Sequence, residues 1–185
     1  MELQQRKRLV YLAGFMGSGK STIGPILANT IGFEYVDVDK LIEDQIGKRI
    51  TEIFEELGEP GFRSLEKKAL KEVAGRNDTV IALGGGTIAN EENFKLIHGS
   101  GVIVYLKLSP EEILKRVKHK TDRPLLKDVQ GAVLSEGEMQ KRIEDLLQSR
   151  HQFYARADVV VETDRQRVGR TIDEIVRKLR HVLAI

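Results

Sequence analysis

The stretch GFMGSGKS, residues 14–21, decides the fold. It follows an apolar segment, RLVYLA, and opens a helix-like one. Gly14-x-x-x-x-Gly19-Lys20-Ser21 is the phosphate-binding (Walker A) pattern, in the strand-to-helix context that this pattern requires. Its glycines let backbone N–H groups surround phosphate oxygens, and the start of the helix adds a positive dipole. The stretch predicts a nucleotide site in which Lys20 reaches the β- and γ-phosphates and Ser21 binds Mg²⁺.

Strand-like and helix-like segments alternate along the chain, which predicts an α/β domain on a parallel sheet. We expect strands at Arg8–Ala13, Phe33–Asp37, Thr79–Leu83, Val102–Lys107 and Val159–Glu162. We expect helices at Lys20–Thr30, Lys40–Ile46, Thr51–Leu57, Pro60–Ala74, Glu91–Ile97, Pro110–Lys118, Glu138–Arg156 and Thr171–Leu183. Gly32 is placed to end the first helix, and Ser109-Pro110 to open the sixth. The segment Lys118–Glu138, between the sixth and seventh expected helices, has weak periodicity and is predicted to be a long loop. Long loops in compact domains are usually functional or disordered.

Composition bounds the remaining possibilities. The 185 residues fit one domain, and 41% hydrophobic with 31% charged residues is typical of a globular protein. There is no cysteine, which excludes disulfides and thiolate metal sites, and the net charge of +2 is too small to indicate nucleic acid as the main partner. No apolar run approaches the length of a membrane span, and the N-terminal segment lacks the features of a signal peptide. We therefore expect a cytoplasmic protein with no membrane partner.

Two aspartates at the end of one apolar strand are candidates for the catalytic acids. Many proteins with this loop hold the metal with an Asp after a second strand, and only FEYVDVD, residues 33–39, ends in acids. Residues two apart on an extended chain point the same way, so Asp37 and Asp39 face the γ-phosphate if this strand lies beside the phosphate-loop strand. We assign Asp37 to Mg²⁺ through water and Asp39 to the proton of an attacking hydroxyl. The alternative is that Asp37 ends the strand and Asp39 caps the next helix.

Basic residues are candidates for gripping an acidic acceptor. Arg63 and Glu66 lie three apart on a predicted helix, so Glu66 can hold the guanidinium for a bidentate carboxylate ligand. The alternative is an ordinary surface ion pair. The long loop and the residues before it are also basic, and they could close over ATP and exclude water, or they could form a solvated charged face. The basic residues concerned are Lys115, Arg116, Lys118, Lys120, Arg123 and Lys127.

Three consecutive glycines, Gly84–Gly86, end the strand-like segment TVIAL. This strand should end at the same edge of the sheet as the phosphate loop, because parallel sheets bind ligands at the carboxyl ends of their strands. The glycines are then expected to form a wall of the acceptor pocket, with N–H groups that donate to substrate oxygens or to a water near Mg²⁺. The alternative is a tight turn into the next helix.

Together these stretches resemble the shikimate kinases. GFMGSGKSTIG, DVDKLIE, EIFEELGEPGFRSLE, ALGGGT, DRPLL and SRHQFYARAD occur in the order and spacing of that family, over nearly the whole chain. The resemblance implies a three-layer P-loop kinase fold of the nucleoside-monophosphate-kinase type. Such a fold has a five-stranded parallel sheet with helices on both faces, a helical substrate-binding segment at about residues 38–75 and a lid at about 118–130. It also implies Mg²⁺-dependent phosphorylation of the shikimate 3-hydroxyl by ATP, in chorismate and aromatic amino-acid biosynthesis.

The resemblance assigns roles position by position. For ATP it implies Gly17, Ser18, Gly19, Lys20, Ser21 and Thr22 in the loop, Arg116 beside the adenine and Arg123 of the lid on the phosphates, with Ser21 also on the metal. For shikimate it implies Asp39 on the hydroxyls and as the base, Arg63 and Arg150 on the carboxylate, and Gly85 through its backbone. Gln166 is the expected adenine contact, with Arg165 and Arg167 as alternatives.

Two other functions remain open at this point. One is a gluconate-type sugar-acid kinase, with the same loop and an acidic acceptor. The other is a nucleotide switch that turns over ATP with no acceptor and regulates a partner. The combined motifs favour shikimate, and with it a monomer that acts on small molecules.

Overall fold

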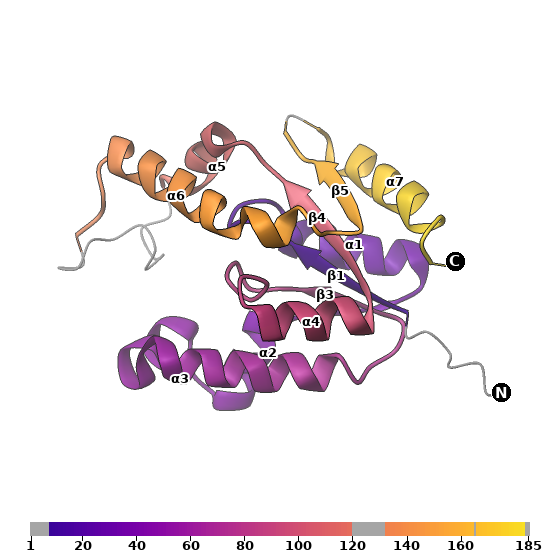
Figure 1. Cartoon of the computed structure of the whole chain (residues 1–185), viewed down its shortest axis with the longest axis horizontal. Coiled ribbons are helices and arrows are strands. Elements are labelled where there is room, and N and C mark those ends of the chain that lie inside the picture. Colours follow the sequence, from indigo (N-terminus) through magenta and orange to yellow (C-terminus); the bar gives the residue numbers. More distant parts are fainter. Residues whose placement is uncertain (1–7, 120–131, 165, 184–185) are drawn as a thin grey trace.

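A five-stranded, wholly parallel sheet organises the chain (Figure 1). The structure, a computed structural model, describes residues 8–119, 132–164 and 166–183. The strands are β1 (Leu9–Ala13), β2 (Glu34–Asp37), β3 (Thr79–Ala82), β4 (Val102–Lys107) and β5 (Val159–Glu162), in the spatial order β2-β3-β1-β4-β5. The parallel five-stranded sheet that the sequence predicted is confirmed.

Helices cover both faces of this sheet, as expected. They are α1 (Lys20–Ile31), α2 (Val38–Ile46), α3 (Ile50–Val73), α4 (Glu91–Ser100), α5 (Pro110–Val117), α6 (Glu136–Tyr154) and α7 (Val168–Leu179). Alternate side chains of β1 point to opposite faces, because a strand has a period of two. Tyr11 packs with α3, α4 and the end of α6, whereas Val10 and Leu12 pack with α1 and α7 (Figure 1). Above the phosphate loop, α5 and α6 form a third apolar cluster around Phe15.

Local signals placed the helix ends correctly where a cap determines them. Gly32 ends α1 in the left-handed conformation, at φ 72°, and its N–H donates to Ala28 and Asn29. Ser109 opens α5 by accepting a hydrogen bond from the N–H of Glu112, with Pro110 in the first turn. The expected lid, about 118–130, falls almost entirely outside the described residues.

The condition set for Asp37 and Asp39, that their strand lies beside the phosphate-loop strand, is not met, whereas the expected break between two helices near residue 58 is confirmed. β2 does not lie beside the phosphate-loop strand, because β3 pairs with both β2 and β1 and separates them. The segments expected as two helices, 51–57 and 60–74, form the two parts of α3, which meet at a kink at Gly58 (φ 65°, ψ −178°). Gly58 is non-helical, and Pro60 stands in the first turn of the second part, where its missing N–H breaks no helical hydrogen bond.

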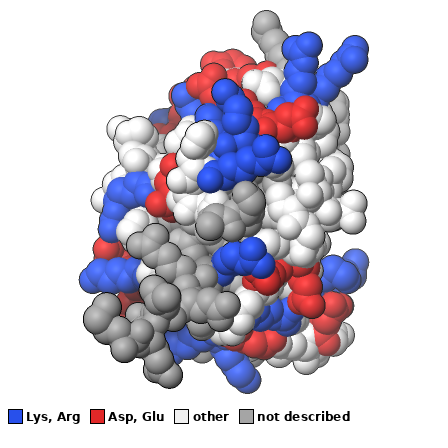
Figure 2. All heavy atoms as spheres, turned by 90° about the vertical axis from the view of Figure 1, so that its right-hand side faces the viewer, with Lys and Arg blue, Asp and Glu red and all other residues white. Residues whose placement is uncertain are grey.

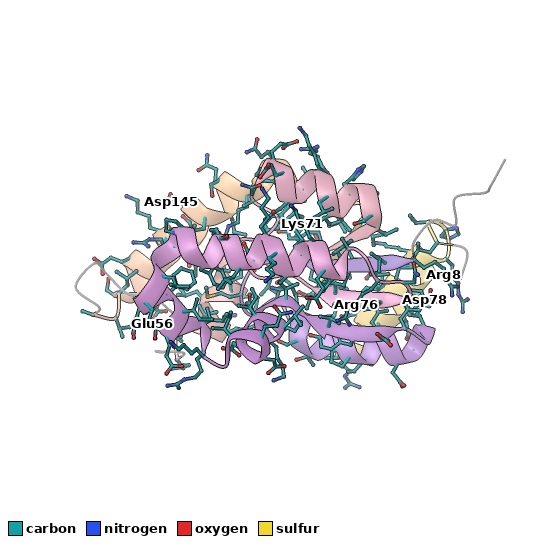
Figure 3. All side chains as sticks on the ribbon, turned by 90° about the horizontal axis from the view of Figure 1, so that it is seen from below. Arg8, Glu56, Lys71, Arg76, Asp78 and Asp145 are labelled. Carbon is teal, nitrogen blue, oxygen red and sulfur yellow. The ribbon has the colours of Figure 1, made fainter. Side chains whose placement is uncertain are left out.

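The amino end of the sheet, opposite the phosphate loop, carries a polar cluster of its own. Arg8, Asp78 and Arg76 gather there (Figure 3), and Arg8 Nε lies 2.6 Å from Asp78 Oδ1. Lys and Arg side chains are interspersed with Asp and Glu on the face turned to the right in Figure 1 (Figure 2). This face therefore offers no continuous positive surface to a polyanion. Among the described helices, none is long and apolar enough to span a membrane.

Candidate active site

A cavity of about 550 Å³ opens at the carboxyl ends of β1, β2 and β3. Its walls come from the phosphate loop, the start of α1, the turns into α2 and α3, and the end of β3. The lining residues are Met16, Gly17, Gly19, Lys20, Ser21, Thr22, Asp37, Asp39, Lys40, Glu43, Arg49, Ile50, Thr51, Leu83 and Gly85. The cavity thus brings together the predicted phosphate, metal and proton-accepting residues, although β3 stands between the strands that carry them.

The phosphate loop has the backbone that its glycines allow. Gly17 and Gly19 have φ 79° and 98°, in the left-handed region that other residues rarely adopt. Gly14 is closely packed: a Cβ there would lie 2.8 Å from the carbonyl of Leu106. Lys20 Nζ donates to the carbonyls of Gly14 (2.7 Å) and Phe15 (3.2 Å), so its ammonium spans the mouth of the loop. The loop and the N-terminus of α1 form a ready anion site.

The structure distinguishes the local positions of Asp37 and Asp39 at the start of α2. Asp37 caps α2: its Oδ1 accepts hydrogen bonds from the N–H groups of Asp39 (3.0 Å) and Lys40 (3.2 Å). The alternative in which Asp39 caps this helix is therefore wrong, and Asp39 lies in its first turn instead. The Tyr35 hydroxyl donates to Asp37 Oδ2 over a long 3.5 Å. Burial, and then the charge of Asp37, raise the pKa of Tyr35, so the phenol stays protonated beside this carboxylate.

The three glycines after β3 serve a turn and a pocket wall together. Thr87 N donates to Gly84 O and Ala89 N to Gly86 O, which closes a turn into α4. None of the three has a positive φ. What they provide is close approach: a Cβ on Gly84 would lie 2.8 Å from Asp39 Oδ1, and one on Gly86 would lie 2.9 Å from Arg63 Nη2. Gly85 lines the cavity, so both interpretations of this stretch hold in part.

Arg63 is held from one side by a buried carboxylate. Its Nη1 donates to Glu66 Oε2 (2.9 Å), and Glu66 is only 1% exposed. Glu59, which is exposed, accepts from Arg63 Nε and Nη2 at 3.3 and 3.1 Å. Partial burial lowers the pKa of Arg63, but the charges and hydrogen bonds of Glu66 and Glu59 outweigh this and raise it. The pair is not an ordinary surface ion pair, because the Glu66 carboxylate is buried.

Arg150 is a buried cation on the other side of the glycine turn. It comes from α6, is 7% exposed, and its guanidinium carbon lies 5.3 Å from the ring centroid of Phe15. Among the described residues, no carboxylate lies within ion-pair distance of it. A Cβ on Gly85 would lie 3.9 Å from Arg150 Nη1. A buried charge needs a partner of opposite sign, and here the turn and the cavity lie next to it.

Arg116 ties α5 to the nucleotide loop. Its Nη1 donates to the carbonyl of Gly17 (3.0 Å) and its Nη2 to the carbonyl of Thr163 (3.4 Å). Gln166 is exposed between β5 and α7, near the residue that Arg116 reaches, and Arg167 is the N-cap of α7. Arg123 and Arg165 lie outside the described residues.

This geometry can be compared with known proteins. A family model described as shikimate kinase matches residues 16–180. The shikimate kinase of Chlorobaculum tepidum is 48% identical over 175 residues, which cover 94% of this chain and 92% of the relative. The chain belongs to the shikimate kinase family. The solved structure of the shikimate kinase from Acinetobacter baumannii, in complex with shikimate, has a TM-score of 0.85 and 33% identity, covering 95% of this chain and 94% of that one.

The fold alone does not separate shikimate kinases from other kinases. A gluconokinase from Sinorhizobium meliloti shares it with a TM-score of 0.59 over 96% of this chain and 94% of that one, but at 17% identity. At that identity the likeness shows the fold only. Membership of the shikimate kinase family comes from the family model and from the curated relatives.

Several residues of the shikimate kinase site were not singled out in the sequence. Lys40, Glu43 and Arg49–Thr51 line the cavity from α2 and the start of α3. The ring of Phe15 lies against the Arg150 guanidinium, and the Thr87 hydroxyl donates a hydrogen bond to Glu66. The position of Phe15 inside the phosphate loop was a usable signal, because an aromatic residue at a loop bend must pack against something. Nothing local marks Thr87, whose partner lies 21 residues away.

Proposed function

We propose that this chain transfers the γ-phosphate of ATP to the 3-hydroxyl of shikimate, giving shikimate 3-phosphate and ADP. The observation that carries this is that Arg63 and Arg150 approach neighbouring residues of the glycine turn, Gly86 and Gly85, and that Gly85 lines a cavity together with Lys20 and Asp39. Two guanidinium groups suit the carboxylate of the acceptor, which an Arg engages through two parallel hydrogen bonds. The phosphate loop supplies the nucleotide site of a small-molecule kinase with ATP as its co-substrate.

On the nucleotide side, residues 17–22 hold the ATP phosphates, and Lys20 exchanges its two carbonyl partners for β- and γ-phosphate oxygens. Arg116 and Gln166 flank the adenine, with Arg165 and Arg167 as alternatives to Gln166. Arg123 reaches the phosphates from the lid. Because phosphoryl transfer involves little covalent chemistry for the protein, these contacts act by positioning and by neutralising charge.

The residues at the metal position fit Mg²⁺. Ser21 and Asp37 both line the cavity, and hydroxyl and carboxylate oxygens are the hard donors that Mg²⁺ prefers. Asp37 Oδ1 accepts two N–H groups at the cap of α2, whereas Oδ2 has only the long 3.5 Å contact with the Tyr35 hydroxyl, so Oδ2 is the atom offered to the ion or to its water. Bound there, Mg²⁺ would neutralise charge on the β- and γ-phosphates.

On the acceptor side, Arg63 and Arg150 bind the carboxylate and the Gly85 backbone contacts the ring. Asp39 binds the ring hydroxyls and either takes the proton of the attacking hydroxyl or orients it. One chain supplies all of these groups, in line with a monomer of a single domain. Within it, about 38–75 bind the acceptor, and about 118–130 close as a lid that keeps water from the γ-phosphate.

The experiment is a coupled assay of ADP release with shikimate, with gluconate and with no acceptor. The proposal predicts rapid release only with shikimate and Mg²⁺. Release that gluconate supports equally well would indicate a sugar-acid kinase, and release that needs no acceptor would indicate a nucleotide switch. Either outcome would overturn the proposed function.

A further inference from the structure

Arg63 is the end of a buried chain of polar groups, and Thr87 is its inner member. The Thr87 hydroxyl donates to Glu66 Oε1 at 2.6 Å, and Glu66 Oε2 accepts from Arg63 Nη1 at 2.9 Å. Thr87 is fully buried and Glu66 is 1% exposed. The two carboxylate oxygens thus have different partners: one faces a neutral hydroxyl inside the protein, and the other faces the guanidinium.

The backbone of Thr87 is itself fixed by two hydrogen bonds. Its N–H donates to Gly84 O, and its carbonyl accepts from Asn93 Nδ2 at 3.0 Å, within α4. Asn93 is also buried. The chain of contacts therefore runs from α4 through the glycine turn to α3, and it connects this turn to the Arg63 guanidinium beside Gly86.

Arg63 contacts a second carboxylate, that of Glu59, so the orientation of its guanidinium depends on how firmly Glu66 is held in place. Glu59 accepts from Nε and Nη2 on the solvent side, whereas Glu66 holds Nη1 on the buried side. Without the hydroxyl, Glu66 Oε1 would be a buried acceptor with no donor among the residues that the structure describes, which is costly for a charged group. The carboxylate would turn to satisfy it, and Arg63 would follow Glu59 away from the turn.

We propose that Thr87 is a positioning residue for binding of the acceptor carboxylate: its hydroxyl fixes Glu66, which aims Arg63. The inference rests on the proposed function, since it names how that site holds its acceptor. It assigns to Thr87 no contact with substrate. If Thr87 acts in this way, its substitution should change shikimate binding only in a protein that retains Arg63.

The test compares Thr87→Val, which removes the hydroxyl at similar volume, with Thr87→Ser, which keeps it. The matched control is Thr79→Val: Thr79 is also fully buried, stands at the far end of β3, and donates to Asn77 O at 2.7 Å. We expect Thr87→Val to raise the KM for shikimate about tenfold or more, as for the loss of one hydrogen bond to a buried charge, with the KM for ATP unchanged. Thr87→Ser should be close to wild type, and Thr79→Val should lower the melting temperature with no effect on KM. If Thr87→Val does not fold, Thr87→Ala carries the same comparison.

A double-mutant cycle separates positioning from general loosening of the site. In an Arg63→Ala background, Thr87→Val should add no further rise in the KM for shikimate. Methyl shikimate, which lacks the carboxylate charge, should bind wild type and Thr87→Val equally. An unchanged KM in Thr87→Val, an equal effect of Thr79→Val, or a full additional effect without Arg63 would each overturn the inference. A wild-type protein with no shikimate-dependent ADP release would instead overturn the proposed function.

Discussion

Arg150 Nη1 lies 3.9 Å from the point where a side chain on Gly85 would begin. The guanidinium is buried and stacked on Phe15, so it has little freedom to retreat. The backbone of Gly85 does not require glycine, since its φ is not positive. The absence of a side chain here is therefore explained by the space that it leaves in front of Arg150.

Gly85→Ala tests that explanation. The added methyl makes only ordinary contacts with the protein, so we expect the melting temperature to change little. Because the methyl enters the cavity in front of Arg150, the KM for shikimate should rise about tenfold or more, the usual effect of one misplaced methyl group in a binding pocket. The control is Gly99→Ala in α4, where nothing lies within 4 Å and alanine should raise stability without a kinetic effect. Unchanged kinetics in Gly85→Ala would remove Gly85 from the acceptor site.

Arg63→Ala tests the other guanidinium. We expect the KM for shikimate to rise about ten- to a hundredfold, because a charge-assisted contact to the carboxylate is lost, and the melting temperature to fall, because the buried Glu66 loses its cation. Lys67→Ala is the control from the next turn of α3, where an exposed pair with Glu92 contributes little. An Arg63→Ala protein with the wild-type KM would contradict the carboxylate role.

The sequence predicted the elements of this fold well and their arrangement less well. Caps such as Gly32 and Ser109 act within a few residues, so helix ends could be predicted from local chemistry. The order of strands depends on crossovers that no local pattern records, so the sequence could state the position of β2 only as a condition, and β3 lies between β2 and β1. Motif spacing gave Lys20, Asp39 and Arg63, which line or adjoin the same cleft. Burial of Glu66 by Thr87, and of Arg150 by Phe15, depends on packing between distant segments and needed coordinates.

Lys20→Ala should abolish turnover while leaving the fold intact. Its ammonium contacts two loop carbonyls and faces the cavity, so its removal takes away the positive charge nearest the expected phosphates. We expect a loss of at least about a hundredfold in kcat, measured as ADP release. Lys178→Ala, which removes a lysine paired with Glu174 on α7 and outside the cavity, should retain most activity. Substantial turnover by Lys20→Ala would contradict the phosphate assignment.

Arg49 stands at the N-cap of α3, a position where its side chain offers no acceptor. Glu52 accepts from the Arg49 N–H at 2.8 Å, but the Arg49 side chain has only donors and cannot accept from a first-turn N–H in return. We therefore expect Arg49→Ser to stabilise the protein by about 0.5–1 kcal/mol, measured by urea denaturation. Ser109→Ala, which removes the working cap of α5, should destabilise it by about 1 kcal/mol. A fall in stability for Arg49→Ser would show that the arginine makes a contact worth more than a cap.

The four tyrosines should make the folded protein sensitive to alkali. Burial is the largest cause that raises the pKa of each, and the pKa of Tyr105 rises to about 12. Above pH ~10 the unfolded chain releases phenolic protons that the folded chain retains, so the free energy of unfolding should fall as pH rises from about 10 to 12. With no tryptophan in the chain, tyrosinate absorbance should appear late in the native protein and near pH ~10 in urea. Tyr105→Phe should remove one of the four transitions and lessen the loss of stability over this range. Native titration with a midpoint near pH 10 and no loss of structure would contradict the burial of these phenols.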